Sequence, residues 1–404
     1  MTDKIILYYN DVAFSPSDAF LTRDFGQVPY VLAERHNADL EFWIATKVRN
    51  SAYPSFRGRT VRQFGKMFAA WPDQLDILKN ASLYFRLLRQ KGTSHMVIFP
   101  FTPATDMIVA VLAKFRSPKL KLIVKLDANA EFLNKVASDW HEASGWKRKF
   151  RQSFYYRNLL KMADAVICET SNCEKILRNN YLDLDLGKKL AKTFSGVSSN
   201  WLASMGITPF DGGERANRIV VSGRLSIWVK YTSLIFDAGP PPPGWTIEFI
   251  GEVNDDFQKV IDEYRRKDTR FDEYYRFHGT IMDKNKYFDI LMNSRVLLMN
   301  SRGPEGFPNV YADAHFSRLF IVTSDIASSY DATGGGRWGI IYERENADAL
   351  RAALASIPDR IDDFDRDPSV DEYRKNFIWE SSLVQPVLEN LFVARKPKIG
   401  HGPL

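Results

Sequence analysis

The residues Arg302-Gly303-Pro304-Glu305-Gly306-Phe307-Pro308-Asn309 have types and spacing suited to binding an anion. They follow a strand-like run at 294–300 and lead into a helix-like run at 310–317. A loop rich in glycine and proline between a parallel strand and a helix offers a phosphate free N–H groups and the positive end of the helix dipole. The segment therefore predicts a site for a phosphate-bearing ligand.

Two acidic residues lie in the same segment. Glu305 falls in the loop, and Asp313 falls in the helix that follows. A carboxylate repels phosphate, so both side chains should face another part of the ligand, and sugar hydroxyls are their natural partners. Phosphate donors and hydroxyl acceptors in one short segment indicate a nucleotide-sugar.

Two further segments carry groups of the same kind. Val220-Val221-Ser222-Gly223-Arg224 reads as a strand ending in Gly-Arg, and Lys230 follows six residues later. Arg224 and Lys230 could neutralise a diphosphate as it departs, although they could equally be surface cations beside a turn. The segment 276–281 reads as a strand end followed by Gly279, Thr280 and Ile281, which could hold a base or form a simple turn.

The elements that must position these residues alternate along the chain. Strand-like segments in the first half are 5–9, 39–45, 95–101, 121–126, 165–168 and 192–194, with helix-like segments at 72–90, 104–115, 145–162 and 172–179. In the second half, strands are expected at 218–222, 246–250, 274–277, 295–299, 319–323 and 340–342, with helices at 255–267, 284–292, 310–317 and 347–356. This alternation predicts parallel, doubly wound sheets.

The glycine- and proline-bearing stretch 195–216 interrupts the alternation and reads as a linker. The expected organisation is an N-terminal domain at 1–200, a nucleotide-sugar-binding domain at 201–375, and a C-terminal helix and tail at 376–404 that packs back on the first domain. The final helix is expected near 371–394. A ligand crevice should lie between the domains, at the carboxyl ends of the strands.

Gly-Arg followed by Lys, His-Gly after a strand, and Glu-Gly-Phe-Pro-Asn before a helix occur in one domain. This combination resembles the retaining GT-B glycosyltransferases of family 4, also called glycosyl transferases group 1. The resemblance implies a GT-B fold of two Rossmann-like domains and no metal or other cofactor. It implies that Glu305 contacts the donor sugar, that Gly306, Phe307, Pro308 and Asn309 hold the donor, and that Arg224 and Lys230 bind its diphosphate. Gly279, Thr280 and Ile281 would lie near the base.

The sequence departs from the family at three places. Asp313 stands where the family usually has a ribose-binding glutamate, one methylene longer. Residues 10–16 lack the Gly-Gly of the usual loop after the first strand. Asp127 follows the strand at 121–126, where relatives often place a histidine, so Asp127 is a candidate acceptor-side or catalytic group; it could equally be a helix cap.

Charge is divided unevenly along the 404 residues. Residues 1–200 hold 30 Lys and Arg against 19 Asp and Glu, whereas the remainder hold 25 against 30. The excess of +11 is densest between Lys47 and Lys125 and suggests that the N-terminal domain meets an anionic membrane, although a solvated basic face is an equal alternative. Nucleic acid is a poor fit because no recognition motif occurs.

Composition is that of a globular protein, and no apolar run approaches the length of a membrane span. The N-terminus lacks signal-peptide features, and two cysteines suggest neither disulfides nor a zinc site. A cytoplasmic enzyme, peripheral on the inner face of the membrane, is expected.

The predicted function is transfer of a sugar, with retention, from a nucleotide-sugar to a glycan or lipid-linked acceptor in bacterial surface-polysaccharide synthesis. A nucleotide-sugar epimerase of related fold and a non-catalytic nucleotide-sugar-binding protein are the alternatives.

Overall fold

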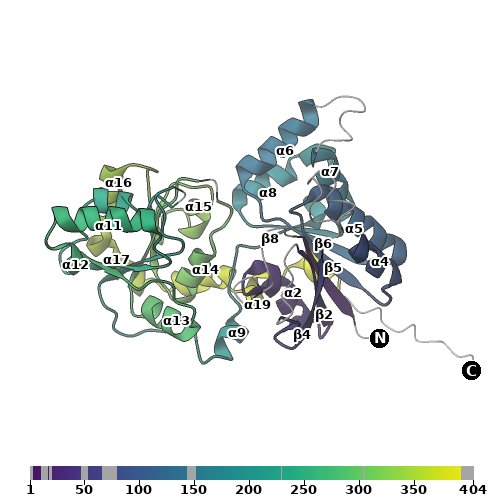
Figure 1. Ribbon diagram of the computed structural model, residues 1–404, viewed down its shortest axis with the longest axis horizontal. Helices are drawn as coiled ribbons and strands as arrows, with labels where there is room; N and C mark the ends of the chain where they lie inside the picture. The colour runs from purple at the N-terminus through teal and green to yellow at the C-terminus, as the bar shows by residue number, and fades with distance from the viewer. Residues whose placement is uncertain are drawn as a thin grey trace, which may run out of the picture.

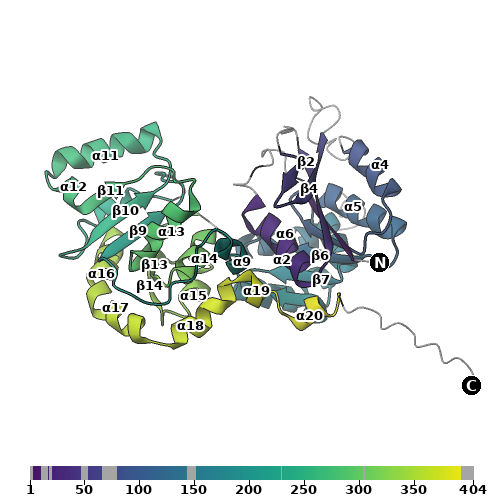
Figure 2. The same cartoon turned by 90° about the horizontal axis from the view of Figure 1, so that it is seen from below.

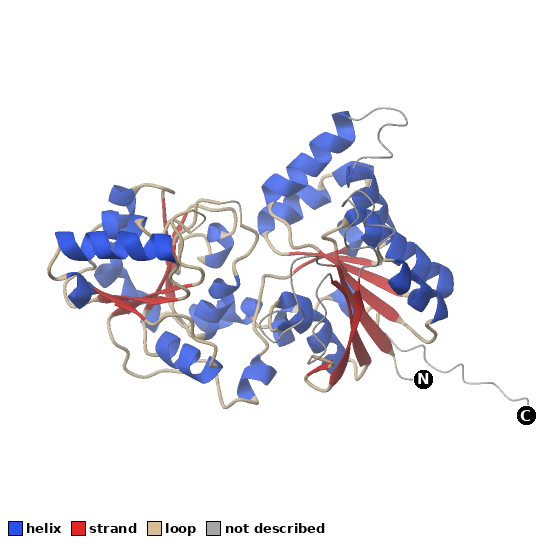
Figure 3. Ribbon diagram, in the orientation of Figure 1, coloured by secondary structure: helices blue, strands red, loops and turns tan. Residues whose placement is uncertain are grey.

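The computed structural model describes residues 3–10, 17, 21–46, 53–65, 80–142, 152–228, 230–303 and 305–392. The chain forms two α/β domains that lie side by side, each with its own sheet (Figures 1 and 3). None of the described helices is long and apolar enough to cross a membrane.

The N-terminal domain is built on an eight-stranded sheet in the order β3-β4-β2-β1-β5-β6-β7-β8. Neighbouring strands are parallel except β3 and β4, which pair antiparallel. The strands are β1 (Lys4–Asn10), β2 (Asp39–Thr46), β3 (Ser55–Phe56), β4 (Arg59–Gly65), β5 (His95–Phe99), β6 (Lys121–Lys125), β7 (Ala165–Cys168) and β8 (Leu190–Lys192). The apolar runs of the central strands β1, β5, β6 and β7 are nearly unbroken because both faces of the sheet are covered there.

Alternate side chains of β1 divide the core of this domain in two. Ile6 and Tyr8 pack toward one layer of helices, and Ile5 and Leu7 pack toward the other. The first layer contains α4 (Ala81–Arg89), α5 (Pro103–Arg116), α6 (Ala130–Glu142), α7 (Gln152–Met162) and α8 (Ser171–Arg178). The second contains α2 (Asp24–Arg35) with α19 (Trp379–Ser382) and α20 (Pro386–Glu389) from the end of the chain (Figure 2). Two short 3-10 turns, η3 (Tyr181–Asp183) and η4 (Gly187–Lys189), precede β8.

The C-terminal domain has a six-stranded parallel sheet in the order β11-β10-β9-β12-β13-β14. Its strands are β9 (Arg218–Ser222), β10 (Thr246–Ile250), β11 (Tyr275–Phe277), β12 (Val296–Met299), β13 (Phe320–Ser324) and β14 (Gly339–Tyr342). Counted in chain order this is 3-2-1-4-5-6, the order of a Rossmann sheet, in which ligands bind where the order reverses, between the first and fourth strands. Those strands are β9 and β12.

Helices cover both faces of the second sheet. One face carries α10 (Leu234–Asp237), α11 (Asp255–Lys267), α12 (Phe271–Tyr274), α16 (Ala347–Ala355) and α17 (Ile357–Arg366). The other carries α9 (Ser199–Ala203), α13 (Lys284–Met292), α14 (Asn309–Phe316) and α15 (Ser329–Ala332). The chain then continues through α18 (Ser369–Arg374) and η5 (Lys375–Phe377) toward the first domain.

The chain crosses between the domains twice, and the two crossings pair with each other. Val197 and Ile378 form a parallel bridge, in which the Val197 N–H donates to the Phe377 carbonyl at 3.0 Å. A Cβ on Gly196 would lie 2.9 Å from that carbonyl oxygen, so the close approach requires glycine. Glu380 then accepts hydrogen bonds from Ser198 Oγ at 2.6 Å and from the Ser199 N–H at 2.9 Å at the start of α9. Hydrogen bonds therefore join the two crossings into a single connection between the domains.

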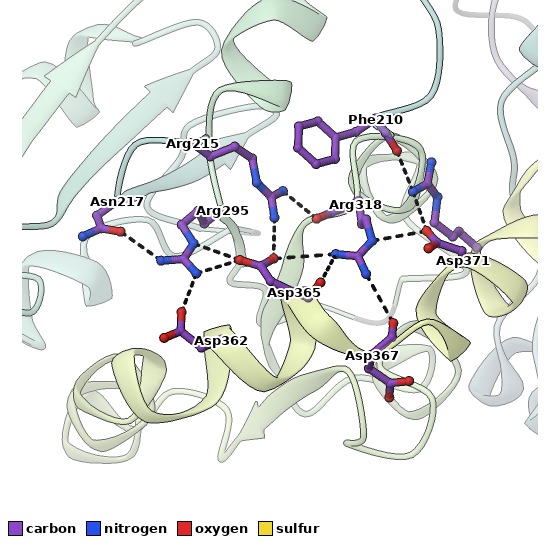
Figure 4. Close-up of polar contacts among 10 residues, drawn as sticks. Phe210, Arg215, Asn217, Arg295, Arg318, Asp362, Asp365, Asp367 and Asp371 are labelled. Atoms are coloured by element: carbon purple, nitrogen blue, oxygen red, sulfur yellow. Dashed lines mark hydrogen bonds and ion pairs between the residues drawn. The ribbon is translucent and has the colours of Figure 1, made fainter. Parts of the chain in front are cut away.

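An arginine–aspartate network closes the C-terminal domain at the amino end of β12 (Figure 4). Asp365 of α17 lies 2.5 Å from Arg215 and 2.6 Å from Arg295. Arg318 lies 3.7 Å from Asp365 and 3.2 Å from Asp371. Asp365 therefore joins the linker, the sheet and the last helices.

Several expected elements differ in extent. The single helix expected at 371–394 is wrong, because α18, η5, α19 and α20 divide that segment where it pairs with Val197 and where Pro386 starts a new turn. The elements α2, β4 and α6 were not expected. The helices expected at 72–90 and 145–162 begin in residues outside the described part, and their described portions are α4 and α7. The loop 11–16 and the tail 393–404 lie wholly outside the described residues.

Candidate active site

A cavity of about 950 Å³ lies between the two domains, at the carboxyl ends of their strands. The first domain contributes Thr22, Arg23 and Gln27 from the start of α2, with Phe56 and Arg57. The linker contributes Val197, Ser198 and Trp201, and the second domain contributes the ends of β9 and β12 with parts of α13 and α14. The expected crevice is thus present and is lined from both sides.

The end of β9 brings Ser222, Gly223 and Arg224 to the cavity. A Cβ at Gly251, after β10, would lie 1.8 Å from the Gly223 carbonyl oxygen, so neighbouring strand ends can pack this closely only without a side chain there. Arg224 is exposed on the cavity wall, and no side chain in the described part of the chain forms an ion pair with it. Its guanidinium is therefore available to an anionic ligand.

Lys230 and Glu305 face each other across the cavity wall. The Lys230 Nζ lies 2.7 Å from both carboxylate oxygens of Glu305. The Ser301 hydroxyl, from the end of β12, also donates to Glu305. Lys230, which was expected to bind the phosphate, thus neutralises the Glu305 carboxylate, which would otherwise repel the phosphate. The spacing of the two residues in the sequence did not predict this pair.

The loop after Glu305 is anchored by an aromatic side chain. Phe307 is buried; its ring stacks on Phe194 with the centroids 5.3 Å apart and meets Tyr311 edge-to-face with the centroids 5.5 Å apart. Pro308 and Asn309 line the cavity, and α14 begins at Asn309. Phe307 therefore acts as a packing residue, while the helix start presents its N–H groups to the cavity.

Asp313 also lines the cavity, one turn into α14. The Tyr287 hydroxyl donates to Asp313 Oδ2 at 2.9 Å and lies 3.1 Å from Ser222 Oγ. Burial raises the pKa of the Asp313 carboxyl, and the charge of Lys284 opposes that shift. Asp313, Tyr287 and Ser222 form a polar chain that could bind ligand hydroxyls.

Of the three residues expected near a base, Ile281 alone lines the cavity. The Gly279 carbonyl accepts from the Gly251 N–H at 2.9 Å, and Thr280 is exposed outside the cavity. Gly279 and Thr280 therefore shape the strand ends behind the site. Asp283, Lys284 and Asn285, which the sequence did not single out, line the wall beside Ile281.

Asp127 lies against Gly306, in the loop that follows β12 of the other domain. A Cβ on Gly306 would meet Asp127 Oδ1 at 3.4 Å and Glu169 Oε2 at 3.3 Å. Glu169 follows β7 and is paired with Lys125, the last residue of β6, which lies 3.3 Å from Asp24 Oδ2 of α2. Glu169, Lys125 and Asp24 were not identified from the sequence because they come from distant segments and belong to no local motif.

The protein environment raises the pKa of two of these carboxyls. Burial raises the pKa of Glu169, against the opposing charge of Lys125. Asp127 is partly exposed, but the crowded crevice wall desolvates its carboxylate, and the like charge of Asp24 adds to the upward pKa shift. Among the described residues, no group of three or more His, Cys, Asp or Glu side chains is arranged to hold a metal ion.

The fold is that of the GT-B glycosyltransferases, two Rossmann-like domains facing a crevice. Within this class, residues 216–359 match the family model described as Glycosyl transferases group 1. This match covers most of the C-terminal domain and contains Arg224, Lys230, Glu305 and Asp313. It supports a glycosyltransferase-type enzyme.

Solved structures of the same fold match nearly the whole chain. Sucrose-phosphate synthase from Thermosynechococcus elongatus has a TM-score of 0.63 at 13% identity, with 96% of this chain and 97% of that one covered. HepE of Anabaena in complex with UDP has a TM-score of 0.61 at 13% identity, with 96% and 98% covered. The lipopolysaccharide outer core galactosyltransferase WaaB has a TM-score of 0.61 at 16% identity, with 92% and 98% covered. No curated protein matches the sequence significantly.

Proposed function

We propose that the protein is a retaining glycosyltransferase of family 4 that moves a sugar, without a metal, from a nucleotide-sugar to a hydroxyl of a glycan or lipid-linked acceptor. The observation that carries the proposal is the interdomain cavity in which Arg224 is available and Glu305 is held by Lys230 and Ser301. Cations and helix N–H groups serve a diphosphate, and carboxylates serve sugar hydroxyls.

In this proposal each side of the cavity has its own part of the reaction. Arg224 and the start of α14 stabilise the diphosphate as negative charge develops on it. Glu305 and Asp313 orient the donor through its hydroxyls, with Lys230 fixing the Glu305 carboxylate. The acceptor approaches from the N-terminal domain, where Arg23 and Arg57 line the cavity and favour an acceptor that carries negative charge.

A role on the cytoplasmic face of a membrane, in surface-polysaccharide synthesis, is also part of the proposal. The neighbouring helices α4 and α5 expose Phe85 at 66% and Phe115 at 77%, beside the exposed Arg86 and Arg89. Aromatic side chains among cations suit an anionic bilayer. WaaB, which has the same fold, is a lipopolysaccharide outer core galactosyltransferase, and HepE was solved in complex with UDP-glucose.

The deciding experiment begins with thermal shifts of the full chain against UDP-, GDP-, ADP- and CMP-sugars. The donor that stabilises the protein is then incubated with membrane glycolipid extract, with and without a chelator, and the product's anomeric configuration is read by NMR. Chelator-insensitive transfer with retention supports the proposal.

Other outcomes identify the alternatives. Isomerised donor without acceptor indicates an epimerase. Tight donor binding without turnover under any condition indicates a binding protein. No stabilisation by any nucleotide-sugar contradicts the proposed donor site altogether.

A further inference from the structure

The N-terminal domain places three carboxylates and one lysine behind the donor loop. Lys125 ends β6, Glu169 follows β7, and Asp24 begins α2. Asp127, two residues after β6, completes the group; it is exposed and lies beside Gly306, but it is not one of the residues that line the cavity. Glu169 and Asp127 both approach the Cα of Gly306, which belongs to the other domain.

If every member of this group were ionised, the three carboxylates would carry more negative charge than Lys125 can neutralise. Lys125 is 0% exposed and Glu169 is 1% exposed. Within the described part of the chain, Lys125 is the one cation in direct contact with Asp24 and Glu169, and Arg23 lines the cavity. Isolated buried charge is costly, so a buried carboxyl in excess of its cations keeps its proton instead.

The hydrogen bonds of Glu169 show where that proton belongs. Glu169 Oε1 accepts from Lys125 and from the Ser195 hydroxyl, at 3.2 Å in the latter case. Glu169 Oε2 is buried and has no hydrogen-bond partner among the described residues. It faces the same side of Gly306 as Asp127 Oδ1. An unpartnered acceptor in a dry site is unfavourable, whereas a protonated Oε2 can donate toward Asp127.

We propose that Glu169 is a neutral carboxylic acid that holds Asp127 ionised and oriented, and that Asp127 takes the proton of the acceptor hydroxyl. The inference rests on the proposed transferase function. In the step, the acceptor O–H bond breaks and its proton passes to Asp127. The acceptor oxygen bonds to the anomeric carbon, and the bond from that carbon to the phosphate oxygen breaks with its electron pair on the departing nucleoside diphosphate.

In this arrangement Asp127 is the catalytic residue and Glu169 is a positioning residue. Asp24 balances the charge of Lys125, and Lys125 and Ser195 together fix Oε1 of Glu169, so that Oε2 remains for Asp127. The upward pKa shift of Glu169 caused by burial agrees with a neutral acid. Because Gly306 closes the group, the unit is complete only when the two domains are together.

If Glu169 had a purely structural role as an ionised partner of Lys125, it would carry no proton. Infrared spectra of the full chain at neutral pH distinguish the two protonation states. For a protonated Glu169, a carbonyl stretch of carboxylic acid is expected in the wild type and should disappear in Glu169→Gln. Asp313→Asn identifies any contribution from Asp313. Glu41→Gln is the matched control, since Lys4 and Arg62 contact Glu41 and its pKa is lowered to about 2 despite the opposing effect of burial.

The second measurement is the rate of donor hydrolysis, in which water replaces the acceptor. It is followed as release of nucleoside diphosphate from the donor selected by thermal shift. Asp127→Asn should reduce release at least 100-fold while leaving the donor thermal shift intact. Glu169→Ala, which removes the hydrogen-bond donor to Asp127, should lower release at least 10-fold, and Glu169→Gln, which keeps a neutral donor, should recover most of that loss near neutral pH. The wild-type rate should fall at alkaline pH as Glu169 ionises, and that fall should be absent in Glu169→Gln.

Absence of the acid band from the wild type, or a band in Glu169→Gln as strong as in the wild type, overturns the proposal whatever the activity. Normal release by Asp127→Asn overturns the catalytic assignment. Failure of the wild type to bind any nucleotide-sugar would instead defeat the proposed function, and the infrared result would still stand.

Discussion

Lys230 and Ser301 hold the Glu305 carboxylate on the wall of the cavity. In the proposed function this carboxylate binds a hydroxyl of the donor sugar. We expect Glu305→Gln to reduce turnover about 10- to 100-fold, because one charge-assisted contact contributes roughly 1.5–3 kcal/mol. Initial rates measured beside circular dichroism of the same sample check this. A folded variant with the wild-type rate would remove Glu305 from the reaction.

Arg224 has a different role because its guanidinium has no ion-pair partner within the described residues. Arg224→Ala should weaken donor binding by roughly 10- to 100-fold without altering stability, since a charge-assisted contact to phosphate is lost. Calorimetric titration of the donor measures the effect. Arg266→Ala, at an exposed arginine on α11, is the control, and equal affinities of both variants would place the diphosphate elsewhere.

At the residue scale, the sequence predicted the groups that lie close together along the chain. Arg224, Lys230, Glu305 and Asp313 line one cavity, as their motifs suggested. The Glu169 group could not be predicted, because Lys125 meets Asp24 across 101 residues and Glu169 across 44. Such contacts depend on the order of strands in the sheet, which a single sequence does not determine.

At the scale of elements, the alternation of apolar runs was sufficient for most strands, because parallel strands are buried on both faces. It was insufficient for β4, where Arg59, Arg62 and Gln63 interrupt the apolar pattern near the sheet edge. It also failed for α2, which contains Pro29 and Gly26 yet packs firmly on the sheet. Tertiary packing outweighed local propensity at both places.

The outer face of α4 and α5 carries the membrane prediction. Phe85→Ser with Phe115→Ser, and separately Arg86→Glu with Arg89→Glu, should each lower binding to anionic liposomes about 10-fold or more. Co-sedimentation with phosphatidylglycerol vesicles measures binding of the full chain. Lys259→Glu with Arg266→Glu, on the exposed surface of α11, should leave binding unchanged, and an equal loss there would indicate nonspecific charge attraction.

The network around Asp365 ties α17 to the sheet and linker. Asp365→Asn should lower the free energy of unfolding by about 1–3 kcal/mol, because charge-assisted hydrogen bonds from Arg215 and Arg295 and the ion pair with Arg318 are weakened. Urea denaturation tests this against Asp363→Asn, an exposed aspartate on the same helix. Equal midpoints for the two variants would contradict a stabilising role.

At the scale of the whole molecule, the C-terminal segment belongs to the core of the first domain. Trp379 is fully buried against the same face of the sheet as Ile5 and Leu7. Trp379→Ala should cost about 3–5 kcal/mol of stability, as large core truncations do. Val384→Ala, at a position 45% exposed in the same segment, should cost far less in the same denaturation experiment. Similar losses would mean that the segment is peripheral.

The double crossing at Val197 and Ile378 also sets an order of events during synthesis. The sheet of the first domain is complete in sequence once Lys192 has been made, yet Trp379, Leu383 and Leu388, which cover one of its faces, are still to be made. At ribosomal rates of about 5–20 residues per second, that face waits roughly 10–40 s for its cover. The first domain therefore cannot mature ahead of the second. Completion of its core therefore signals that the second domain has already been synthesised.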